Sequence, residues 1–394
     1  MAKKESSRVV ALILGAGLAT RMGECKVLLP LGGKSALEQI ADRLRAGDID
    51  EIWVVTGARE PMVRGEAQRL GCSVVYNAAY REGMFSSVYA GVSALPRCAD
   101  GFLLLPGDTP LIKPETIRTL LRAFEKNKNL VYPTFLGERG HPPVIGNSLI
   151  PSILNWRGDG GLRALLEERD SLAAHVPILD RGVLLDMDTP EDYRGLEEYL
   201  KGEYIPDRQE CDALLALAGT AQPVIRHCRM VAQVALVLAS ALEKSGIFSD
   251  LMLLQAACLL HDIAKAHGEH EALGARWLRK GGYGSVGALV ALHKDLPPSD
   301  TLSEAELLYL SDKIVEGEKV SSLDARLQRM KERYPQGSQG RESAKRRIGR
   351  AQLIQKKIES ITGKSLYELL DGNIRPPGFW VCLPRNDLAR RIRF

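Results

Sequence analysis

The sequence VVALILGAGLATRMGECK, at residues 9–26, joins six apolar residues to a glycine-rich segment. A short, uninterrupted apolar run is typical of a strand that is buried on both faces of a parallel sheet. Glycines directly after such a strand let the backbone approach a ligand and turn successive N–H groups toward an anion. Arg21 and Lys26 add positive charge that suits a triphosphate and the pyrophosphate that leaves it. The stretch predicts an α/β fold with a phosphate-binding loop after its first strand.

This loop matches neither of the two commonest glycine-rich phosphate loops. It has no Gly-Lys-Ser/Thr ending, as in a Walker P-loop, and it lacks the third glycine of the dinucleotide fingerprint. A tight turn with incidental basic residues would produce the same pattern. The loop alone therefore leaves its ligand open.

Strand and helix patterns alternate from this loop to about residue 200. Apolar runs lie at 9–14, 52–56, 73–76 and 102–105, and helical patterns cover 36–44, 66–70, 86–95, 114–124 and 190–200. One more strand is expected at 183–185, before a helix capped by Thr189 with Pro190 in its first turn. The alternation predicts a doubly wound, Rossmann-like α/β domain over residues 1–200. Ligands of such a sheet bind at the carboxyl ends of its strands.

The pattern changes between residues 200 and 210. Helical patterns then cover 213–217, 223–243, 251–264, 269–280, 286–293, 303–314 and 343–361, and no strand is predicted between 211 and 370. The sequence predicts an all-α domain over residues 207–370 and an irregular tail over 371–394. A basic stretch at 331–350 is interpreted as a solvated helix face rather than a nucleic-acid contact.

Composition limits the class of protein further. Of 394 residues, 45% are hydrophobic and 26% are charged, and the formal net charge is +4. This is typical of a globular chain and gives no reason to expect nucleic acid or an anionic membrane as a partner. The seven cysteines form no CxxC pair, which fits a reducing compartment. The first apolar run is too short for a signal peptide, and no apolar stretch approaches the length of a membrane span. We therefore expect a cytoplasmic protein.

Residues 14–30 resemble the signature of the MobA-like NTP transferases. They read L-G-A-G and then R-M-G-x-x-K-x-L-L-P, most similar to the molybdenum cofactor cytidylyltransferases, whose loop reads L-A-A-G-x-S-x-R-M-G-x-x-K-x-L-L-P. Gly15 replaces the usual alanine, and Ala19 replaces a common serine. The residues that the resemblance implies for phosphate binding are Gly15, Ala16, Gly17, Arg21 and Lys26.

Further segments match the same family in the same order. They are GMFSS (83–87), PGDTP (106–110), GHPP (140–143), GDGG (158–161) and DMDTPED (186–192). The resemblance implies that Ser86 and Ser87 lie near the base and ribose of the nucleotide. It also implies that Asp108 binds Mg²⁺ and that the segments at 140–143 and 158–161 face the acceptor.

The implied reaction joins an acceptor phosphate to the α-phosphorus of a nucleoside triphosphate and releases pyrophosphate. Positioning and charge neutralisation account for most of the catalysis in such a transfer. Mg²⁺ prefers carboxylate and phosphate oxygens. Asp108 follows the strand at 102–105, and Asp188 follows the expected strand at 183–185, so we favour this pair over Asp186 as Mg²⁺ ligands. Either aspartate could instead stabilise the turn in which it lies.

Five of the seven histidines lie between residues 227 and 293, in the all-α half. A lone histidine on a helix is more often structural, but here imidazoles and carboxylates recur at helix ends. This combination suits Fe, Mn or Zn better than a metal that prefers thiolates. The candidate ligands are His227, His261, Asp262, His270, His293 and Asp312.

The order H…HD…D resembles the HD superfamily of metal-dependent phosphohydrolases over residues 223–320. The segments LHDIAK (260–265) and YLSDKI (309–314) resemble bacterial HD hydrolases that use two metals to cleave diadenosine tetraphosphate or related nucleotides. The resemblance implies that Asp262 bridges two ions of Fe or Mn, which activate a shared water. A regulatory domain that keeps the pattern without turnover is the alternative. Lys265 is expected either to contact phosphate or to be solvated, and His267 matches no family position.

Together these features predict a bifunctional enzyme. The first half is expected to transfer a nucleotide from CTP, or from GTP, to a phosphorylated acceptor such as molybdopterin, with molybdoenzyme maturation proteins as partners. The second half is expected to be a metal-dependent phosphohydrolase. The alternatives are a sugar-phosphate or other small-phosphate nucleotidyltransferase with a regulatory HD domain, and a nucleotide-binding regulatory protein. The residues expected to act in catalysis are Arg21, Lys26, Asp108 and Asp262.

Overall fold

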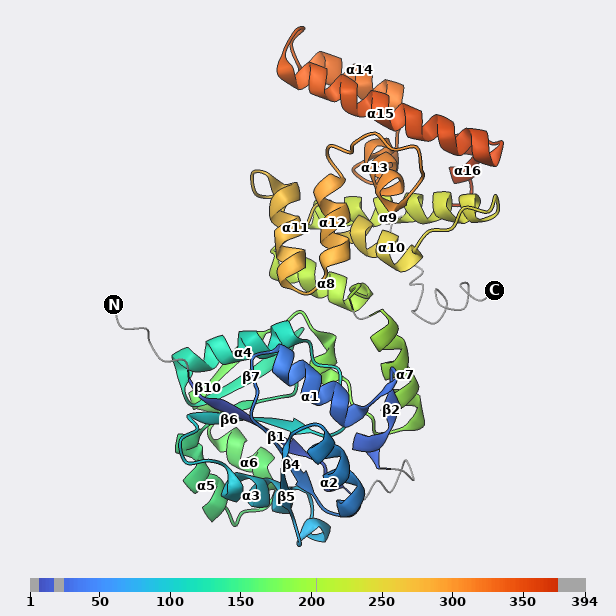
Figure 1. Cartoon of the computed structure of the whole chain (residues 1–394). Coiled ribbons are helices and arrows are strands. Elements are labelled where there is room, and N and C mark those ends of the chain that lie inside the picture. The colour runs from blue at the N-terminus through green and yellow to red at the C-terminus, as the bar shows by residue number, and fades with distance from the viewer. Residues whose placement is uncertain (1–6, 18–24, 203, 375–394) are drawn as a thin grey trace. The chain divides into compact units, whose positions relative to one another are not determined.

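The computed structural model describes residues 7–17, 25–202 and 204–374 (Figure 1). The chain folds into two compact units, Met1–Lys201 and Gly202–Phe394. Arg21 and Ala19 lie outside the described residues, and so does the tail beyond residue 374. The expectations for those residues stay predictions.

A mixed sheet forms the centre of the first unit (Figure 1). Its strands run in the order β10-β7-β9-β6-β1-β4-β5, and β8 pairs with β7. The central strand β1 is parallel to β4 and β6, and β4 is parallel to β5, whereas β9 is antiparallel to β6 and β7. The strands are β1 Val9–Leu14, β4 Ile52–Thr56, β5 Ser73–Tyr76, β6 Gly101–Pro106, β7 Leu130–Phe135, β8 Glu138–Arg139, β9 Val144–Gly146 and β10 Ala173–Pro177. A separate small hairpin pairs β2 Pro30–Leu31 with β3 Lys34–Ser35.

Helices cover both faces of this sheet, which confirms the predicted doubly wound fold (Figure 1). On one face lie α1 Ala36–Ala46 and α4 Pro114–Asn127, and on the other lie α3 Met84–Ala94, α5 Ile150–Asn155 and α6 Gly161–Glu168. α2 Glu60–Arg69 packs beside β4 and β5, and α7 Pro190–Lys201 ends the unit.

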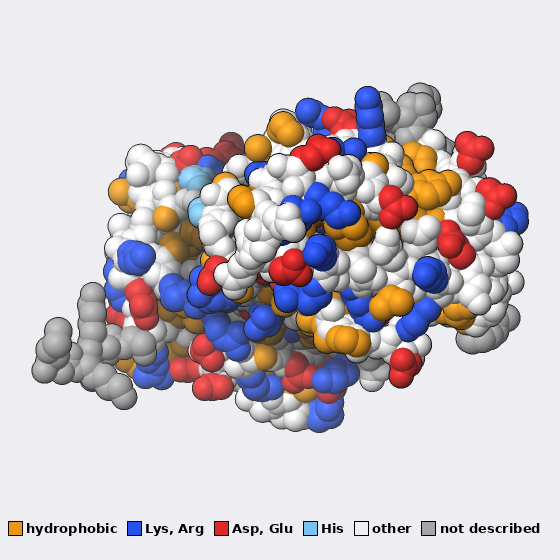
Figure 2. Space-filling view, turned by 90° about the horizontal axis from the view of Figure 1, so that it is seen from above, with side chains coloured by type: hydrophobic (Ala, Val, Ile, Leu, Met, Phe, Trp, Pro, Cys, Tyr) orange, Lys and Arg blue, Asp and Glu red, His pale blue; other side chains and the backbone are white. Residues whose placement is uncertain are grey.

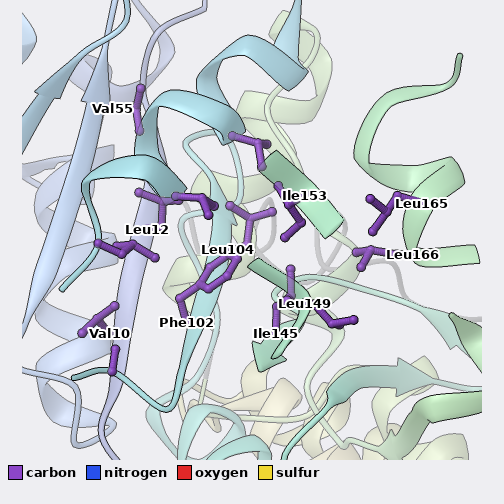
Figure 3. Packing of buried hydrophobic residues seen from close by; sticks show 14 of the residues in the cluster. Val10, Leu12, Val55, Phe102, Leu104, Ile145, Leu149, Ile153, Leu165 and Leu166 are labelled. Carbon is purple, nitrogen blue, oxygen red and sulfur yellow. The ribbon is translucent and has the colours of Figure 1, made fainter. Parts of the chain in front are cut away.

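The core of this unit lies between the sheet and the helices α3, α5 and α6. Leu12, Phe102 and Leu104 of the sheet pack there with Ile153 of α5 and Leu165 of α6 (Figure 3). Each such side chain stabilises the fold by about 1.5–3 kcal/mol relative to an exposed one. This packing fixes β1 and β6 side by side, so that their carboxyl ends are held rigidly.

The strand expected at 183–185 is wrong. The structure has a 3₁₀ helix at Arg181–Leu184, wound around the buried carboxylate of Asp180. That carboxylate accepts hydrogen bonds from the Gly182 N–H at 2.9 Å, the Lys113 N–H at 2.7 Å and the Thr116 hydroxyl at 2.8 Å. These bonds hold the segment as a turn, so Asp188 comes from a loop and not from a strand end.

The second unit is helical, as predicted, with one exception. A two-residue hairpin, β11 Val315–Glu316 and β12 Lys319–Val320, was not expected, because two-residue strands show no sequence periodicity. The predicted helix at 251–264 ends at residue 260. The helices are α8 Arg208–Leu217, α9 Gln222–Glu243, α10 Leu251–Leu260, α11 His270–Lys280, α12 Gly284–Leu292, α13 Glu304–Ile314, α14 Leu323–Arg333, α15 Gln339–Thr362 and α16 Leu366–Leu370.

One helix among the described residues is long and apolar enough to cross a membrane. It is α9, which has 22 residues and an 18-residue window of mean hydropathy 1.3. Half of that window is buried inside the protein, and α9 packs against α10 and α13. α9 meets this criterion of length and mean hydropathy, but Arg226, His227 and Arg229 interrupt its apolar residues and its contacts are those of a core helix.

The basic stretch at 331–350 carries paired charges. Arg347 forms two hydrogen bonds to Asp295, at 2.9 and 2.7 Å, and Lys345 lies 3.1 Å from Glu342. Figure 2 shows Lys and Arg side chains interspersed with Asp and Glu on the face that it presents. Such mixing is typical of a solvated helix face and differs from a continuous cationic surface.

Candidate active sites

A pocket of about 440 Å³ opens where β1 and β6 end. Leu14, the last residue of β1, lies beside Pro106, the last residue of β6, because the two strands are parallel and in register. The predicted residues that line the pocket are Gly15, Ala16, Gly17, Lys26, Ser87, Asp108 and Asp188. The sheet therefore brings together motifs that are far apart in the sequence.

Glycine is required where the two strand ends meet. The Gly107 N–H donates to the Leu14 carbonyl at 3.1 Å, and a Cβ at position 107 would lie only 2.3 Å from Cγ1 of Val27. The Gly15 N–H donates to the Val55 carbonyl at 2.9 Å, so this amide belongs to the sheet. Contact of Gly15, Ala16 or Gly17 with phosphate stays a prediction.

Lys26 lies between the two aspartates that we favoured. Its Nζ is 3.1 Å from Oδ2 of Asp108 and 2.5 Å from Oδ1 of Asp188. Partial burial opposes the charge on Lys26, but the hydrogen bonds to both carboxylates raise the pKa of its ammonium. Partial burial and the charges of Asp188 and Asp108 also raise the pKa of nearby Asp186. Carboxylate oxygens are the ligands that Mg²⁺ prefers, so this donor set fits the ion.

The two predicted serines differ in position. Ser87 lines the pocket, whereas the Ser86 hydroxyl accepts from Nδ2 of Asn77 at 2.9 Å and lies 2.8 Å from the Gly83 carbonyl. Ser86 therefore holds the loop before α3, and its contact with a nucleotide stays a prediction. Gly83 has a φ of 100°, a conformation that favours glycine.

Some residues that line the pocket belong to none of the matched motifs, so the sequence did not predict them. Tyr80 and Arg81 line the pocket, and the Arg81 guanidinium lies 5.6 Å from the centre of the Tyr80 ring. Neither acceptor-side segment, 140–143 or 158–161, is among the lining residues. His141 is nevertheless close enough to interact with Asp108. Desolvation by the surrounding protein lowers the pKa of its imidazole, and the charge of Asp108 opposes that shift.

The six candidate ligands of the second unit converge. Five of them form two groups of three that share one residue, and in each group the possible ligand atoms lie within 4.8 Å of one another. Asp262 belongs to both groups. The first group is His227, His261 and Asp262, and the second is Asp262, His270 and His293. Asp312 borders the first group, with Oδ1 3.2 Å from Nε2 of His227 and 3.6 Å from Nε2 of His261.

Each ligand comes from a helix or from one of the two residues that follow one. His227 lies on α9, His270 begins α11, His293 follows α12, and Asp312 lies in the last turn of α13. The segment after α10 turns sharply, because the Ile263 N–H donates to the Leu260 carbonyl at 3.0 Å and the Lys265 N–H donates to the Asp262 carbonyl at 2.9 Å. These short turns end α10 and place Asp262 between the two groups.

Backbone hydrogen bonds fix the orientation of two imidazoles. Nδ1 of His261 donates to the Cys258 carbonyl at 2.8 Å, and Nδ1 of His293 donates to the Val290 carbonyl at 2.7 Å. In the neutral form that binds a metal ion, each Nε2 carries a lone pair, and both Nε2 atoms lie near Asp262, at 3.6 and 3.5 Å. Nε2 of His261 is buried without a hydrogen-bond partner among the residues that the structure describes. Such an atom is costly unless something binds it, and a metal ion fits.

Both carboxylates of this cluster are held in their ionised form. Burial alone would raise the pKa of Asp262, but the surrounding imidazoles and the Lys265 ammonium hold it well below its usual range. Burial also opposes ionisation of Asp312, and Lys313 and the neighbouring imidazoles likewise hold its pKa well below the usual range. A metal ligand must be deprotonated, so these charges prepare the site.

Three further residues lie close to the candidate ligands in the sequence, and the sequence analysis considered two of them. Lys265 is half exposed, and its Nζ lies 2.9 Å from Oδ2 of Asp262, so it contacts a candidate ligand. His267 is exposed and touches the Trp277 ring edge-on, with ring centres 5.6 Å apart. Sequence reasoning missed Glu271, whose Oε2 lies 3.3 Å from Nδ1 of His270. Its only sequence signal is its position next to a ligand.

Comparison with known families separates the same two halves. The model of the MobA-like NTP transferase domain matches residues 11–174, and the model of the HD domain matches residues 224–317. The first match contains the pocket loop and Asp108, and the second contains all six candidate ligands of the helical unit.

Individual relatives match less than half of this chain. Nicotine blue oxidoreductase from Paenarthrobacter nicotinovorans is 30% identical over 46% of this chain and 93% of its own length. Molybdenum cofactor cytidylyltransferase from Escherichia coli (strain K12) is 26% identical over 48% of this chain and 94% of its own length. The bifunctional protein GlmU from Rhodopseudomonas palustris is 32% identical over 43% of this chain and 36% of its own length, so the chain spans about a third of that relative.

Among solved structures, Rv0371c from Mycobacterium tuberculosis H37Rv aligns with a TM-score of 0.44 and 25% identity, over 49% of this chain and all of that one. After the transferase domain, the sequence continues into an HD domain, which is also of an enzymatic type. The chain belongs to the MobA-like NTP transferase family.

Proposed function

We propose that the first unit transfers a nucleotidyl group from CTP, with Mg²⁺, to a phosphorylated acceptor of the molybdopterin type. The observation that carries this proposal is the position of Lys26 between Asp108 and Asp188, on the wall of a pocket at two strand ends. A bound Mg²⁺ would neutralise phosphate charge and orient the α-phosphorus.

The chain's own residues supply the rest of the proposed mechanism. Ala16 and Gly17 present backbone to the phosphates, and the Lys26 ammonium stabilises the negative charge of the departing pyrophosphate. Asp108 and Asp188 would hold the ion. The acceptor would enter near His141, whose pKa is influenced by the charge of Asp108. Little covalent chemistry is asked of the protein, so rigid strand ends are a suitable support.

The base and the acceptor define the first experiment. CTP, GTP, ATP and UTP are each incubated with the full-length protein, Mg²⁺ and either molybdopterin or a sugar 1-phosphate, and released pyrophosphate is measured. We expect release with CTP and molybdopterin. Release only with a sugar 1-phosphate would instead favour the chemistry of a small-phosphate nucleotidyltransferase. We further propose that the protein acts in the cytoplasm and that molybdoenzyme maturation proteins are its partners.

We infer that the second unit is a phosphohydrolase with two ions of Fe or Mn. The carrying observation is that Asp262 belongs to both three-residue groups, which is the arrangement that two bridged ions require. When bound, the ions would bind substrate phosphate and lower the pKa of a water to near neutrality. His261 and His293 keep fixed orientations through their Nδ1 hydrogen bonds, and Lys265 adds a positive charge at the rim.

This activity is tested with the full-length protein loaded with Mn²⁺ or, without oxygen, with Fe²⁺. Diadenosine tetraphosphate, other dinucleoside polyphosphates and nucleoside triphosphates are offered, and the products are separated by chromatography. Hydrolysis of at least one phosphoanhydride supports the proposal. Two bound ions without turnover of any of them would favour the regulatory alternative.

A further inference from the structure

Lys313 is a buried lysine that the proposed hydrolysis does not use. It lies in the last turn of α13, and only 8% of its side chain is exposed. An ammonium is costly to bury unless it is paired and hydrogen-bonded. The contacts that it makes in the core therefore indicate what it does.

The Lys313 ammonium contacts Asp312, which borders the first group of candidate ligands, and the backbone of His293, which belongs to the second. Its Nζ lies 2.5 Å from Oδ2 of Asp312 and donates to the backbone carbonyl of His293 at 3.0 Å. Asp312 borders the first group through its other oxygen, Oδ1, which faces Nε2 of His227 at 3.2 Å. His293 belongs to the second group. A single side chain thus joins the supports of both groups.

We propose that Lys313 is a positioning residue that fixes candidate ligands of both metal ions at once. By holding Oδ2 of Asp312, it directs Oδ1 toward the first group. By holding the backbone of His293, it keeps that imidazole directed at Asp262. This proposal rests on the proposed two-metal site, and Lys313 itself reaches neither the ions nor the substrate.

The surroundings of Lys313 are rigid enough for this role. Nη1 of Arg326 donates to the carbonyls of Asp312 and Lys313, both at 2.8 Å, and so closes the end of α13. The Tyr309 ring lies under the ammonium, with Nζ 4.7 Å from its centre. On the other side, the hydrogen bond to Val290 already fixes the His293 ring. Lys313 then fixes the position of the Asp312 carboxylate relative to the backbone of His293.

A purely structural role would give a different result from a positioning role. If Lys313 only neutralised Asp312 for folding, its loss would lower the stability of the metal-free protein and leave metal affinity unchanged. If it positions ligands, its loss lowers metal affinity even in a folded protein. Residues that orient metal ligands from outside the coordination sphere typically contribute 10- to 100-fold to affinity.

The test measures Mn²⁺ binding to the full-length protein after removal of metal with a chelator. Lys313→Met keeps the length of the side chain but removes its charge and its donors. We expect the dissociation constants of both ions, followed by the electron paramagnetic resonance of free Mn²⁺, to rise about 10- to 100-fold. Circular dichroism confirms that the variant is folded. The matched control is Ser311→Ala: its Oγ, one residue from Asp312, is buried and has no hydrogen-bond partner among the described residues, so affinity should not change.

A second variant covers the case in which Lys313→Met fails to fold. Lys313→Gln keeps an uncharged N–H donor group on a side chain that is one atom shorter, so we expect an intermediate loss of affinity. Wild-type dissociation constants in a folded Lys313 variant would overturn the positioning role, whatever happens to the melting temperature. A wild-type protein that binds no Mn²⁺ would overturn this proposal together with the proposed metal site. Two ions bound without hydrolysis would overturn only the proposed activity, because the affinity comparison still decides the role of Lys313.

Discussion

Replacing His261 and Asp262 together with alanine should remove both metal ions from the helical unit, whereas replacing His270 should remove one. The double change takes two ligands from the first group and one from the second, because Asp262 is shared. It leaves His227 with neighbouring Asp312 on one side, and His270 with His293 on the other. Two protein ligands are fewer than the three or four that hold such an ion in most proteins.

The single change removes less. Without His270 the second group keeps only Asp262 and His293, whereas the first group and its neighbour Asp312 stay intact. We therefore expect two ions per chain in the wild-type protein, one in His270→Ala and none in the double variant. His267→Ala is the matched control, because this histidine is exposed and belongs to neither group. It should keep two ions.

Stability gives the same prediction a magnitude. An ion present at about 100 times its dissociation constant stabilises the folded protein by about 2.7 kcal/mol. For a unit of this size, each kcal/mol raises the melting temperature by about 2–4 °C. Each bound ion should therefore raise the melting temperature of the helical unit by about 5–10 °C, and that gain should disappear with a chelator.

The assay combines elemental analysis of the dialysed protein with thermal melting, with and without EDTA. The reasoning would be refuted by an ion that remains in the double variant, or by two ions in His270→Ala. Loss of an ion in His267→Ala would also contradict it, because the site would then include a residue that the structure places outside.

Three further predictions concern both units. Lys26→Ala should weaken triphosphate binding about 10- to 100-fold, as expected for a charge-assisted hydrogen bond; calorimetric titration measures this, and Lys34→Ala, which breaks the exposed pair with Asp42, should leave the affinity unchanged. Gly107→Ala should destabilise the first unit by about 1–3 kcal/mol, because the added methyl group overlaps Val27; a denaturation midpoint equal to that of the wild type would show that the strand ends can separate at no cost. Residues 205–394 expressed alone should fold and hydrolyse a phosphoanhydride, since they contain every candidate ligand of the helical unit, and an unfolded or inactive fragment would show that this half depends on the first.

Apolar patterning predicted the central strands well. β1, β4 and β6 were expected because each is a largely apolar run that is mostly buried, and β5 was expected from its short apolar run although it is a partly exposed edge strand. β7, β9 and β10 were missed, since proline, histidine and glycine interrupt their apolar residues. The helix α14, with only Leu323 buried, was missed because it has almost no apolar stripe.

The sequence predicted the candidate metal ligands better than the residues that hold those ligands in place. Motif spacing identified the six candidate ligands, Asp262 among them, because histidines and aspartates recur in the order of the HD pattern. Nothing in the sequence distinguished Lys313 from a solvated lysine, since its burial depends on how α13 packs. The sheet contact of Gly15 was equally hidden, because a pattern of glycines does not show which N–H groups the neighbouring strand already uses.

The most direct test of a chain with two separate active sites compares two isosteric variants of the full-length protein in both assays. Asp108→Asn removes one charge from the transferase pocket, and a charge pair about 4 Å apart at an effective dielectric constant near 20 is worth about 4 kcal/mol, or about 1000-fold in rate. We predict that Asp108→Asn loses nucleotidyl transfer to about this extent and keeps the wild-type hydrolysis rate, and that Asp262→Asn shows the reverse. If either variant lost both activities, or neither, the account of two independent sites would be contradicted.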